Sequence, residues 1–308
     1  MLPMISPAGE RFVDTVNTIQ AKLNIDQQQI ATGLKVNQAS DAPDQISPIL
    51  QLHSDIQQNS DIQTGLNSAQ AELQAADGAL SSSVDLLQSA SVIASQATST
   101  DQTAATRATM AQSVQSLLSQ MVSNSQTALE GRYIFSGDQD QKPLYQLDSN
   151  AAGGVDRLQV AAATKEVRGP NGSTFPVALS GNAIFDHRNP DDTPAPDNVF
   201  AALNNLSVAL QANDTTGIQN SITSLQSAST YLNGQLAFYG QAENRVTTAL
   251  TQTGSRDVSL RSELSGMTDA DLTQSITALT EGQTQLQAAL SARARMPQTS
   301  LFDVLPQP

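Results

Sequence analysis

Cysteine and histidine, the side chains most often used for nucleophilic catalysis and zinc binding, are absent or few in this chain. There is no cysteine among the 308 residues, so disulfides, thiol nucleophiles and cysteine-bound metals are excluded. For His53, one of two histidines, a solvated or helix-packed role is expected because it lies within a helical stretch. His187 follows Asp186, and a metal there would need further ligands. Asp191 and Asp192 are the only nearby source of such ligands, so no metal site is predicted.

Loops that resemble ligand-binding motifs lack the residues that would complete them. Asp138-Gln139-Asp140 begins like a calcium loop, but Pro143 stands where the turn needs glycine, and Ser149 where it needs glutamate. Gly153-Gly154 lacks the spacing of a phosphate-binding loop, and the chain has no Gly-x-Ser-x-Gly nucleophile elbow. We therefore predict no catalytic residue, no cofactor and no metal, and we expect a protein that is not an enzyme.

The charge balance argues against nucleic acids and membranes as partners. The net charge is −14 with only 15 lysines and arginines, whereas binding to phosphates requires clustered basic residues. No apolar run approaches the length of about 18 residues that a membrane span needs, and residues 1–11 lack the pattern of a cleaved signal peptide. Aromatic residues make up 4% of the chain, which favours long helices over a large aromatic core.

The sequence predicts that the chain folds mainly into long amphipathic helices. Apolar residues recur at the alternating three- and four-residue spacing of packed helices. The first stripe contains Phe12, Val16, Ile19, Leu23, Ile30 and Leu34, and the last contains Leu272, Ile276, Leu279, Leu286 and Leu290. Further stripes run through residues 52–87, 110–129, 199–210 and 218–250.

Backbone signals indicate where the two terminal helices begin and end. The prolines at positions 3 and 7 indicate that the first helix starts after Pro7. Gly33 and Pro43 interrupt the first stripe, because proline disfavours helix in the residue before it. Residues 268–271, which read Thr-Asp-Ala-Asp, are a start signal for the last helix.

Three polar residues, Asp26, Asn59 and Asp77, fall at or near apolar positions of the stripes. One interpretation is that they face solvent at a ragged helix edge. The other is that they are buried and fix the register of a contact, as polar residues do in some coiled coils. The sequence leaves both interpretations open.

Residues 131–198 lack the helical pattern of the flanking stretches. Short β-prone runs alternate there with turn signals. The runs are Tyr133-Ile134-Phe135, Leu144-Tyr145, Leu158-Gln159-Val160, Phe175-Pro176-Val177 and Ala183-Ile184-Phe185. Residues 169–173, which read Gly-Pro-Asn-Gly-Ser, predict a hairpin turn. Residues 189–196 are a turn-rich return to helix.

These patterns predict a mainly α protein with a small β insert. The N- and C-terminal halves would form an elongated antiparallel helical bundle or coiled coil, with a β-rich outer domain at its tip. The expected segments are an N-terminal inner helix at 1–42, bundle halves at 43–130 and 199–265, the outer domain at 131–198 and a C-terminal inner helix at 266–308. Both inner helices are expected to be disordered before assembly, because one buried stripe does not offset the entropy of ordering a lone helix.

Both ends of the chain resemble the flagellin superfamily. The likeness is carried by residues 30–43, which read IATGLKVNQASDAP, by 267–271 and by 300–305. The run EGRYIFSG at 130–137 and the SLFD ending are typical of the proteins that join hook to filament, the third hook-associated proteins. Residues 86–93 also lack the arginines found in many flagellins at this level. The tail at 306–308 extends past the usual end of the family.

The resemblance implies a structural subunit of the bacterial flagellum that forms a homo-oligomeric junction ring between hook and filament. The protein would be exported unfolded through the flagellar type III channel, without a cleaved signal peptide, and would be extracellular. Its partners would be the first hook-associated protein, flagellin and a cytosolic export chaperone. The residues expected at subunit contacts are Phe12, Val16, Ile19, Leu23, Ile30, Leu34, Leu272, Ile276, Leu279, Leu286, Leu290, Leu301, Phe302 and Leu305.

Two other functions are compatible with the sequence. The chain could be a filament flagellin with a short outer domain. It could also be a secreted binding module or enzyme with its activity in residues 131–198, although no catalytic constellation is found there. A filament flagellin would differ from the junction subunit in the proteins that it binds. A secreted binding module or enzyme would not be a structural subunit at all.

Overall fold

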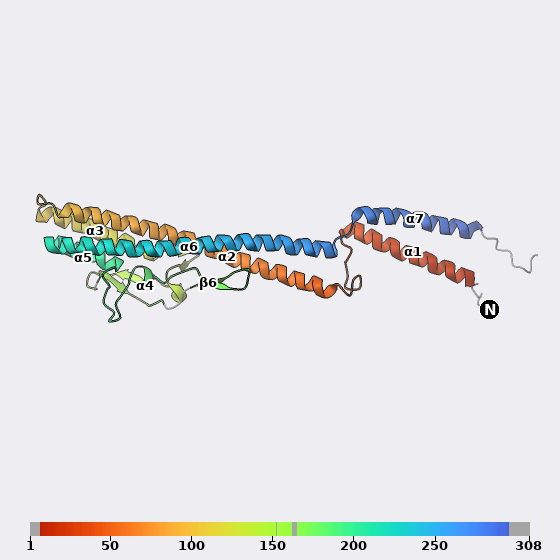
Figure 1. Cartoon of the computed structure of the whole chain (residues 1–308), viewed down its shortest axis with the longest axis horizontal. Coiled ribbons are helices and arrows are strands. Elements are labelled where there is room, and N and C mark those ends of the chain that lie inside the picture. Colours follow the sequence, from red (N-terminus) through yellow and green to blue (C-terminus); the bar gives the residue numbers. More distant parts are fainter. Residues whose placement is uncertain (1–6, 152, 162–164, 296–308) are drawn as a thin grey trace, which may run out of the picture. The chain divides into compact units, whose positions relative to one another are not determined.

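The computed structural model describes residues 7–151, 153–161 and 165–295, and these are mainly helical (Figure 1). They contain seven α-helices, one short 3₁₀-helix, η1 (Gly137–Gln139), and six β-strands. The chain forms two compact units. The terminal unit contains the described residues up to Gln57 and from Asp257 onward, and the central unit contains residues 58–256. The predicted fold class, a helical bundle with a small β region, is confirmed.

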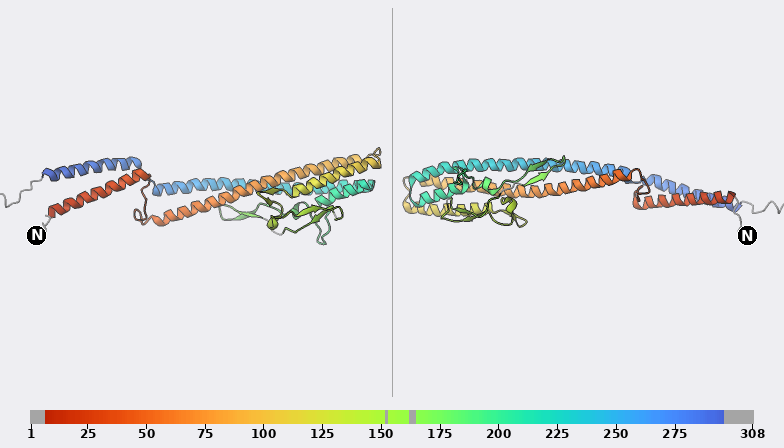
Figure 2. Two further views of the ribbon diagram at one scale, coloured as in Figure 1. Left: turned by 180° about the vertical axis from the view of Figure 1, so that it is seen from behind. Right: turned by 90° about the horizontal axis from the view of Figure 1, so that it is seen from below.

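Four helices build the bundle of the central unit. They are α3 (Ala104–Ser125), α5 (Val199–Gln211) and the greater part of α2 (Ile46–Ala97) and of α6 (Thr215–Thr268), namely residues 58–97 and 215–256. Within this unit the long helices α2 and α6 run side by side in the views of Figure 2, and α3 packs against α5 beside them. The long pair and the short pair together give the central unit a core of its own.

A leucine repeat in α2 forms the centre of this core. Leu66, Leu73, Leu80 and Leu87 recur every seven residues, which is the spacing that keeps one face of a helix against its neighbours. Each of the four is at most 1% exposed. The central unit therefore buries its longest apolar stripe without help from another chain.

Arg107 closes the turn between α2 and α3. Its Nε donates to the carbonyl oxygen of Ala97 over 2.9 Å, and its Nη1 donates to Oδ1 of Asn213 over 2.6 Å. The first bond satisfies a carbonyl at the end of α2, where helices leave such groups unpaired. The second joins this turn to the turn between α5 and α6, so the two helix pairs are bound together at that end of the bundle.

The β region consists of three antiparallel two-stranded sheets. The pairs are β1 (Ala128–Leu129) with β2 (Arg132–Tyr133), β3 (Tyr145–Leu147) with β4 (Val155–Arg157), and β5 (Glu166–Arg168) with β6 (Thr174–Pro176). The predicted hairpin turn joins β5 to β6 and is confirmed. Gly172 adopts a φ of +82° there, and the backbone N–H of Gly169 donates to Ser173 over 2.8 Å.

Two of the predicted β runs are wrong. Residues 183–185 belong to the short helix α4 (Gly181–Ile184) and its end, and residues 158–160 follow β4 instead of forming a strand. A short apolar run has no period that separates helix from strand, which explains the first error. At the start of α4, a Cβ added to Gly181 would lie 2.6 Å from Leu144 Cδ1, so a larger residue there would require Leu144 to move.

The β region lies along the bundle, whereas the sequence suggested a place at its tip. Lys165 pairs with Glu72 in the middle of α2 over 2.5 Å, and Arg256 donates to the carbonyl oxygen of Pro170 over 3.0 Å. The α2–α3 and α5–α6 turns, which Arg107 and Asn213 join, occupy the tip of the central unit instead. The insert begins only after α3 has returned along the bundle, which shifts it by the length of a helix.

Aromatic residues are gathered where the β region meets the bundle. Phe135 and Phe185 meet edge to face at 5.3 Å, and Tyr145 meets Phe200 at 4.9 Å. Burial raises the pKa of both Tyr145 and Tyr239, that of Tyr239 to about 12. These aromatic residues belong to the same buried core as the leucines of α2 and extend that core to the β region.

Candidate functional site

The terminal unit pairs the first and last described helices, α1 (Pro7–Thr32) and α7 (Leu272–Arg295), drawn in red and blue in Figure 1. They run antiparallel. Near the end of α1, Oε1 of Gln29 accepts a hydrogen bond from Oγ of Ser275, near the start of α7, over 3.1 Å. At the opposite end, the guanidinium carbon of Arg293 lies 5.8 Å from the centre of the Phe12 ring. The predicted terminal stripes are therefore brought together within one chain.

Leu23 and Gly282 contact each other in the middle of this pair. A Cβ added at Gly282 would lie 2.8 Å from Cδ2 of Leu23, so a larger residue would displace Leu23. Ser275, Gly282 and Ala289 recur every seven residues on α7. Apolar stripes alone do not reveal this line of small residues, whereas its seven-residue spacing is a sequence signal that does.

Most predicted contact residues keep apolar surface exposed in the single chain. Leu23 is buried at 8% exposure, whereas Leu272, Ile276 and Leu290 are 47%, 53% and 51% exposed. The half-buried members are Phe12, Val16, Ile19, Ile30, Leu34, Leu279 and Leu286. Leu301, Phe302 and Leu305 lie outside the described residues. Pairing of α1 with α7 therefore leaves apolar surface on both helices uncovered, to which the exposed Val13 and Ile25 also contribute.

Backbone hydrogen bonds join the end of α1 to the break between α6 and α7. Gly33 adopts a φ of +72°, which ends α1, and its carbonyl oxygen accepts from the N–H of Ala270 over 2.9 Å. The N–H of Lys35 donates to Thr268 over 2.8 Å, and its Nζ donates to the carbonyl oxygen of Gly266 over 2.8 Å. The two predicted helix breaks thus form one bonded joint.

Asp271 starts α7 as the sequence signal predicted. Its Oδ1 accepts hydrogen bonds from the backbone N–H groups of Thr273 and Gln274, over 2.9 and 3.1 Å. These donors have no partner within the helix, so the carboxylate satisfies them and complements the positive end of the helix dipole.

Two of the three polar residues at apolar positions are buried. Asp26 is 7% exposed, and its Oδ2 has no hydrogen-bond partner. Asn59 is 2% exposed, its Nδ2 donates to the carbonyl oxygen of Thr253 over 3.0 Å, and its Oδ1 has no partner. Asp77 is half-buried. Asp26 and Asn59 therefore do not lie at a solvent-facing helix edge.

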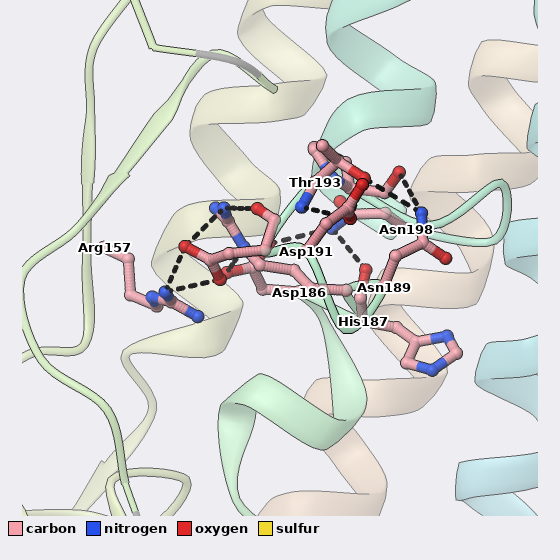
Figure 3. A network of polar contacts seen from close by, with 10 residues as sticks. Arg157, Asp186, His187, Asn189, Asp191, Thr193 and Asn198 are labelled. Carbon is pink, nitrogen blue, oxygen red and sulfur yellow. Dashed lines mark hydrogen bonds and ion pairs between the residues drawn. The ribbon is translucent and has the colours of Figure 1, made fainter.

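A separate polar network orders the loop before α5 in the central unit (Figure 3). Asp186 accepts from Nε of Arg188 over 2.9 Å and from Nδ2 of Asn198 over 2.8 Å. Oδ1 of Asn198 also accepts from the N–H of Ala201 at the start of α5. Arg157 binds Asp192 over 2.8 Å. Asp186 and Asn198 are buried, and the bonds that link these groups to one another position the loop.

His187 belongs to the edge of this network. Its Nδ1 lies 2.7 Å from Oδ1 of Asp197, and its ring stacks on Tyr231 at 4.9 Å. Asp191 is bonded to Thr193, which lowers the pKa of its carboxyl group. Within the described residues, no group of three His, Asp or Glu side chains is placed to hold a metal ion. In the same part of the chain, no helix is long and apolar enough to cross a membrane.

Two family models match the chain. The bacterial flagellin N-terminal helical region matches residues 11–140, and the bacterial flagellin C-terminal helical region matches residues 222–305. The two matches together cover more than half of the chain and include nearly all of α1 and the whole of α7. The chain therefore belongs to the flagellin family.

The similar proteins are components of flagella. The chain is 26% identical over 298 residues to flagellar hook-associated protein 3 of Escherichia coli (strain K12), covering 90% of this chain and 91% of the relative. A putative flagellar hook-associated protein from Vibrio parahaemolyticus has a similar fold, with a TM-score of 0.64, 15% identity and coverage of 74% and 100% of the two chains. A flagellar junction protein from Legionella pneumophila gives a TM-score of 0.55, 15% identity and coverage of 72% and 98%.

Proposed function

We propose that the protein is a structural subunit of the bacterial flagellum that forms the junction ring connecting hook to filament. The sequence match to a hook-associated protein 3 along 90% of the chain supports this role. The observation that carries it is the α1–α7 pair, whose apolar stripes are only partly covered in the single chain. Such surface is suited to burial between copies of a subunit. The role requires binding and no catalysis, so we propose no enzymatic activity.

The proposed subunit contacts use the apolar surface that α1 and α7 do not cover for each other. Burying the exposed half of a leucine or isoleucine contributes on the order of 1 kcal/mol, and a ring repeats this contribution at every subunit. We propose that the segments containing α1 and α7 become ordered only when neighbours supply this burial. The residues proposed to make these subunit contacts are the predicted contact residues on α1 and α7, together with Leu34, Leu301, Phe302 and Leu305.

The proposed partners follow from a junction. One side of the ring would bind the first hook-associated protein and the other would bind flagellin. The chain would reach this place by unfolded export through the flagellar type III channel, without a cleaved signal peptide, and a cytosolic chaperone would shield its C-terminal part. The expectation that the terminal segments are unfolded before assembly agrees with such a route.

Deletion of the gene tests the proposal. We expect cells with an intact hook, no attached filament, and flagellin released into the medium. Restoring the gene should restore filaments. Deletion cells that still carry full filaments would overturn the proposal.

The alternative of a filament flagellin is separated by its partners. In a pull-down, the junction subunit should bind the first hook-associated protein as well as flagellin. A purified filament flagellin should polymerise into long filaments without another protein. Formation of such filaments by this protein alone would favour the alternative.

Limited proteolysis of dilute monomer tests the coupling of folding to assembly. Protease should trim both ends and leave a core of roughly residues 45–265, because segments without buried contacts are cleaved first. The central unit, residues 58–256, lies within this expected core. Ends that resist protease in the monomer would contradict the coupling.

A further inference from the structure

Asp26 lies inside the α1–α7 contact, at a position where the heptad pattern expects an apolar residue. One turn before it, Leu23 fills the space beside Gly282. One turn after it, Gln29 accepts a hydrogen bond from Ser275. Asp26 is 7% exposed and its Oδ2 is buried, so pairing of the two helices removes this carboxylate oxygen from water.

The buried carboxylate of Asp26 is not compensated. Its Oδ2 has no hydrogen-bond partner, and none of the ion pairs among the described residues includes it. Lys22, one turn earlier on α1, is exposed. A charge that is removed from water without a partner opposes the contact that buries it. Asp26 therefore weakens the pairing of α1 with α7.

Other residues at the helix contacts do not share the unpartnered charge of Asp26. Leu23 makes a close apolar contact, and Gln29 has a polar partner on α7. In the central unit, the buried Asn59 is neutral and donates to Thr253, so it keeps one bond. Among these buried seam residues, Asp26 alone combines a carboxylate with an unpartnered oxygen.

We propose that Asp26 is a built-in destabilising residue that keeps α1 and α7 apart in the isolated subunit. The chain ends would thereby stay unfolded and transportable until neighbouring copies cover the exposed apolar stripes. This inference rests on the proposed function, because only an exported, assembling subunit benefits from ends that do not close early. Burial between copies then outweighs the opposition of a single carboxylate.

Amide hydrogen exchange in purified, dilute monomer tests the proposal. Asp26→Leu restores the apolar repeat and should slow exchange in residues 7–32 and 272–295 by roughly tenfold or more relative to wild type. Asp26→Asn keeps the shape without the charge and should give a smaller slowing. Gln27→Leu, at the exposed neighbouring position, is the matched control and should leave exchange unchanged.

Export supplies a second readout. Secretion of the Asp26→Leu variant into the medium should fall relative to wild type and to Gln27→Leu, because prematurely paired ends must be unfolded again. Wild-type exchange rates in Asp26→Leu, or equal slowing by Gln27→Leu, would overturn the proposal. Protected ends with undiminished export would overturn the link to transport.

These results are independent of whether the protein joins hook to filament. Exchange is measured on the isolated chain, whereas the junction role is judged by filaments on deletion cells. Failure of Asp26→Leu to protect the ends, in a protein whose deletion removes filaments, would reject this inference and leave the junction role intact.

Discussion

The central and terminal units are built from the same kind of helix, yet they treat their apolar stripes differently. In α2, Leu66, Leu73, Leu80 and Leu87 are each at most 1% exposed. On α7, Leu272, Ile276 and Leu290 are about half exposed, and one of the few well-buried residues of α1 is Asp26. The stripe alone therefore does not tell whether a helix completes its core within one chain. The number of helices packed around it decides this.

The largest expected effect comes from removing the uncovered surface of α7. The double substitution Ile276→Ser and Leu290→Ser should leave the monomer folded but abolish filament attachment, because each subunit loses on the order of 1–2 kcal/mol of apolar burial. Motility and electron microscopy of the complemented deletion strain measure this. Gln283→Ser with Gln287→Ser, at exposed polar positions of the same helix, is the control and should retain filaments. Loss of filaments in both variants would remove the distinction between the two faces.

The next effect compares one leucine from each unit. Leu80→Ala should lower the free energy of unfolding of the monomer by about 3 kcal/mol, because it leaves a cavity in a closed core. Leu279→Ala should change it by less than about 0.5 kcal/mol if the terminal pair is not formed in the monomer. Urea unfolding followed by tyrosine fluorescence measures both. The chain has no tryptophan, and its four tyrosines lie in the central unit. Equal losses would contradict the difference between the units.

Alkaline pH should lower the unfolding free energy of the central unit through the buried Tyr239. Burial raises the pKa of Tyr239 to about 12 in the folded state, above its ordinary value of 10.0. Below pH 10 Tyr239 is protonated in both the folded and the unfolded chain, so its contribution to the unfolding free energy is fully present. Between pH 10 and 12 the unfolded chain loses this proton and the folded chain keeps it, so unfolding becomes easier by about 2 kcal/mol at pH 12. Urea unfolding followed by circular dichroism between pH 9 and 12 measures this. Tyr239→Phe should flatten part of the fall, and an unchanged profile in that variant would exclude Tyr239 as its source.

The smallest effect concerns the surface attachment of the β region. Lys165→Ala removes the ion pair with Glu72, whose two side chains are partly exposed. We expect a loss of at most about 0.5 kcal/mol in unfolding free energy, since such pairs contribute little in water. The urea midpoint measures this, and a loss approaching that of Leu80→Ala would show that the β region depends on this pair for its place along the bundle.

Much of the helical framework could be predicted from the sequence, because apolar repeats and caps are local signals. The stripe on α2, the stop at Gly33 and the start at Asp271 are examples. The β region was harder to predict. Its place along the bundle depends on contacts such as that of Lys165 with Glu72, which lie 93 residues apart and leave no periodic trace.

The candidate site was predicted in part. The two terminal stripes could be found, and the structure brings them together within one chain. The burial of Asp26 could not be found from sequence, because a carboxylate at a seam position fits a solvent-facing edge equally well until the partner helix is placed. The role of Gly282 could not be predicted from the apolar stripes, because a pattern of large apolar residues does not include the small residue that receives one of them.

The fit of Leu23 beside Gly282 has a mechanical consequence. Sliding α1 along α7 by one helical turn would move Leu23 away from the glycine and toward the larger side chain of Leu279 or Leu286 on the same face. The packing of Leu23 beside Gly282 therefore resists axial sliding of one helix along the other. In a subunit that lies between a rotating hook and a long filament, this contact would transmit axial force from one helix to the other with little relative displacement.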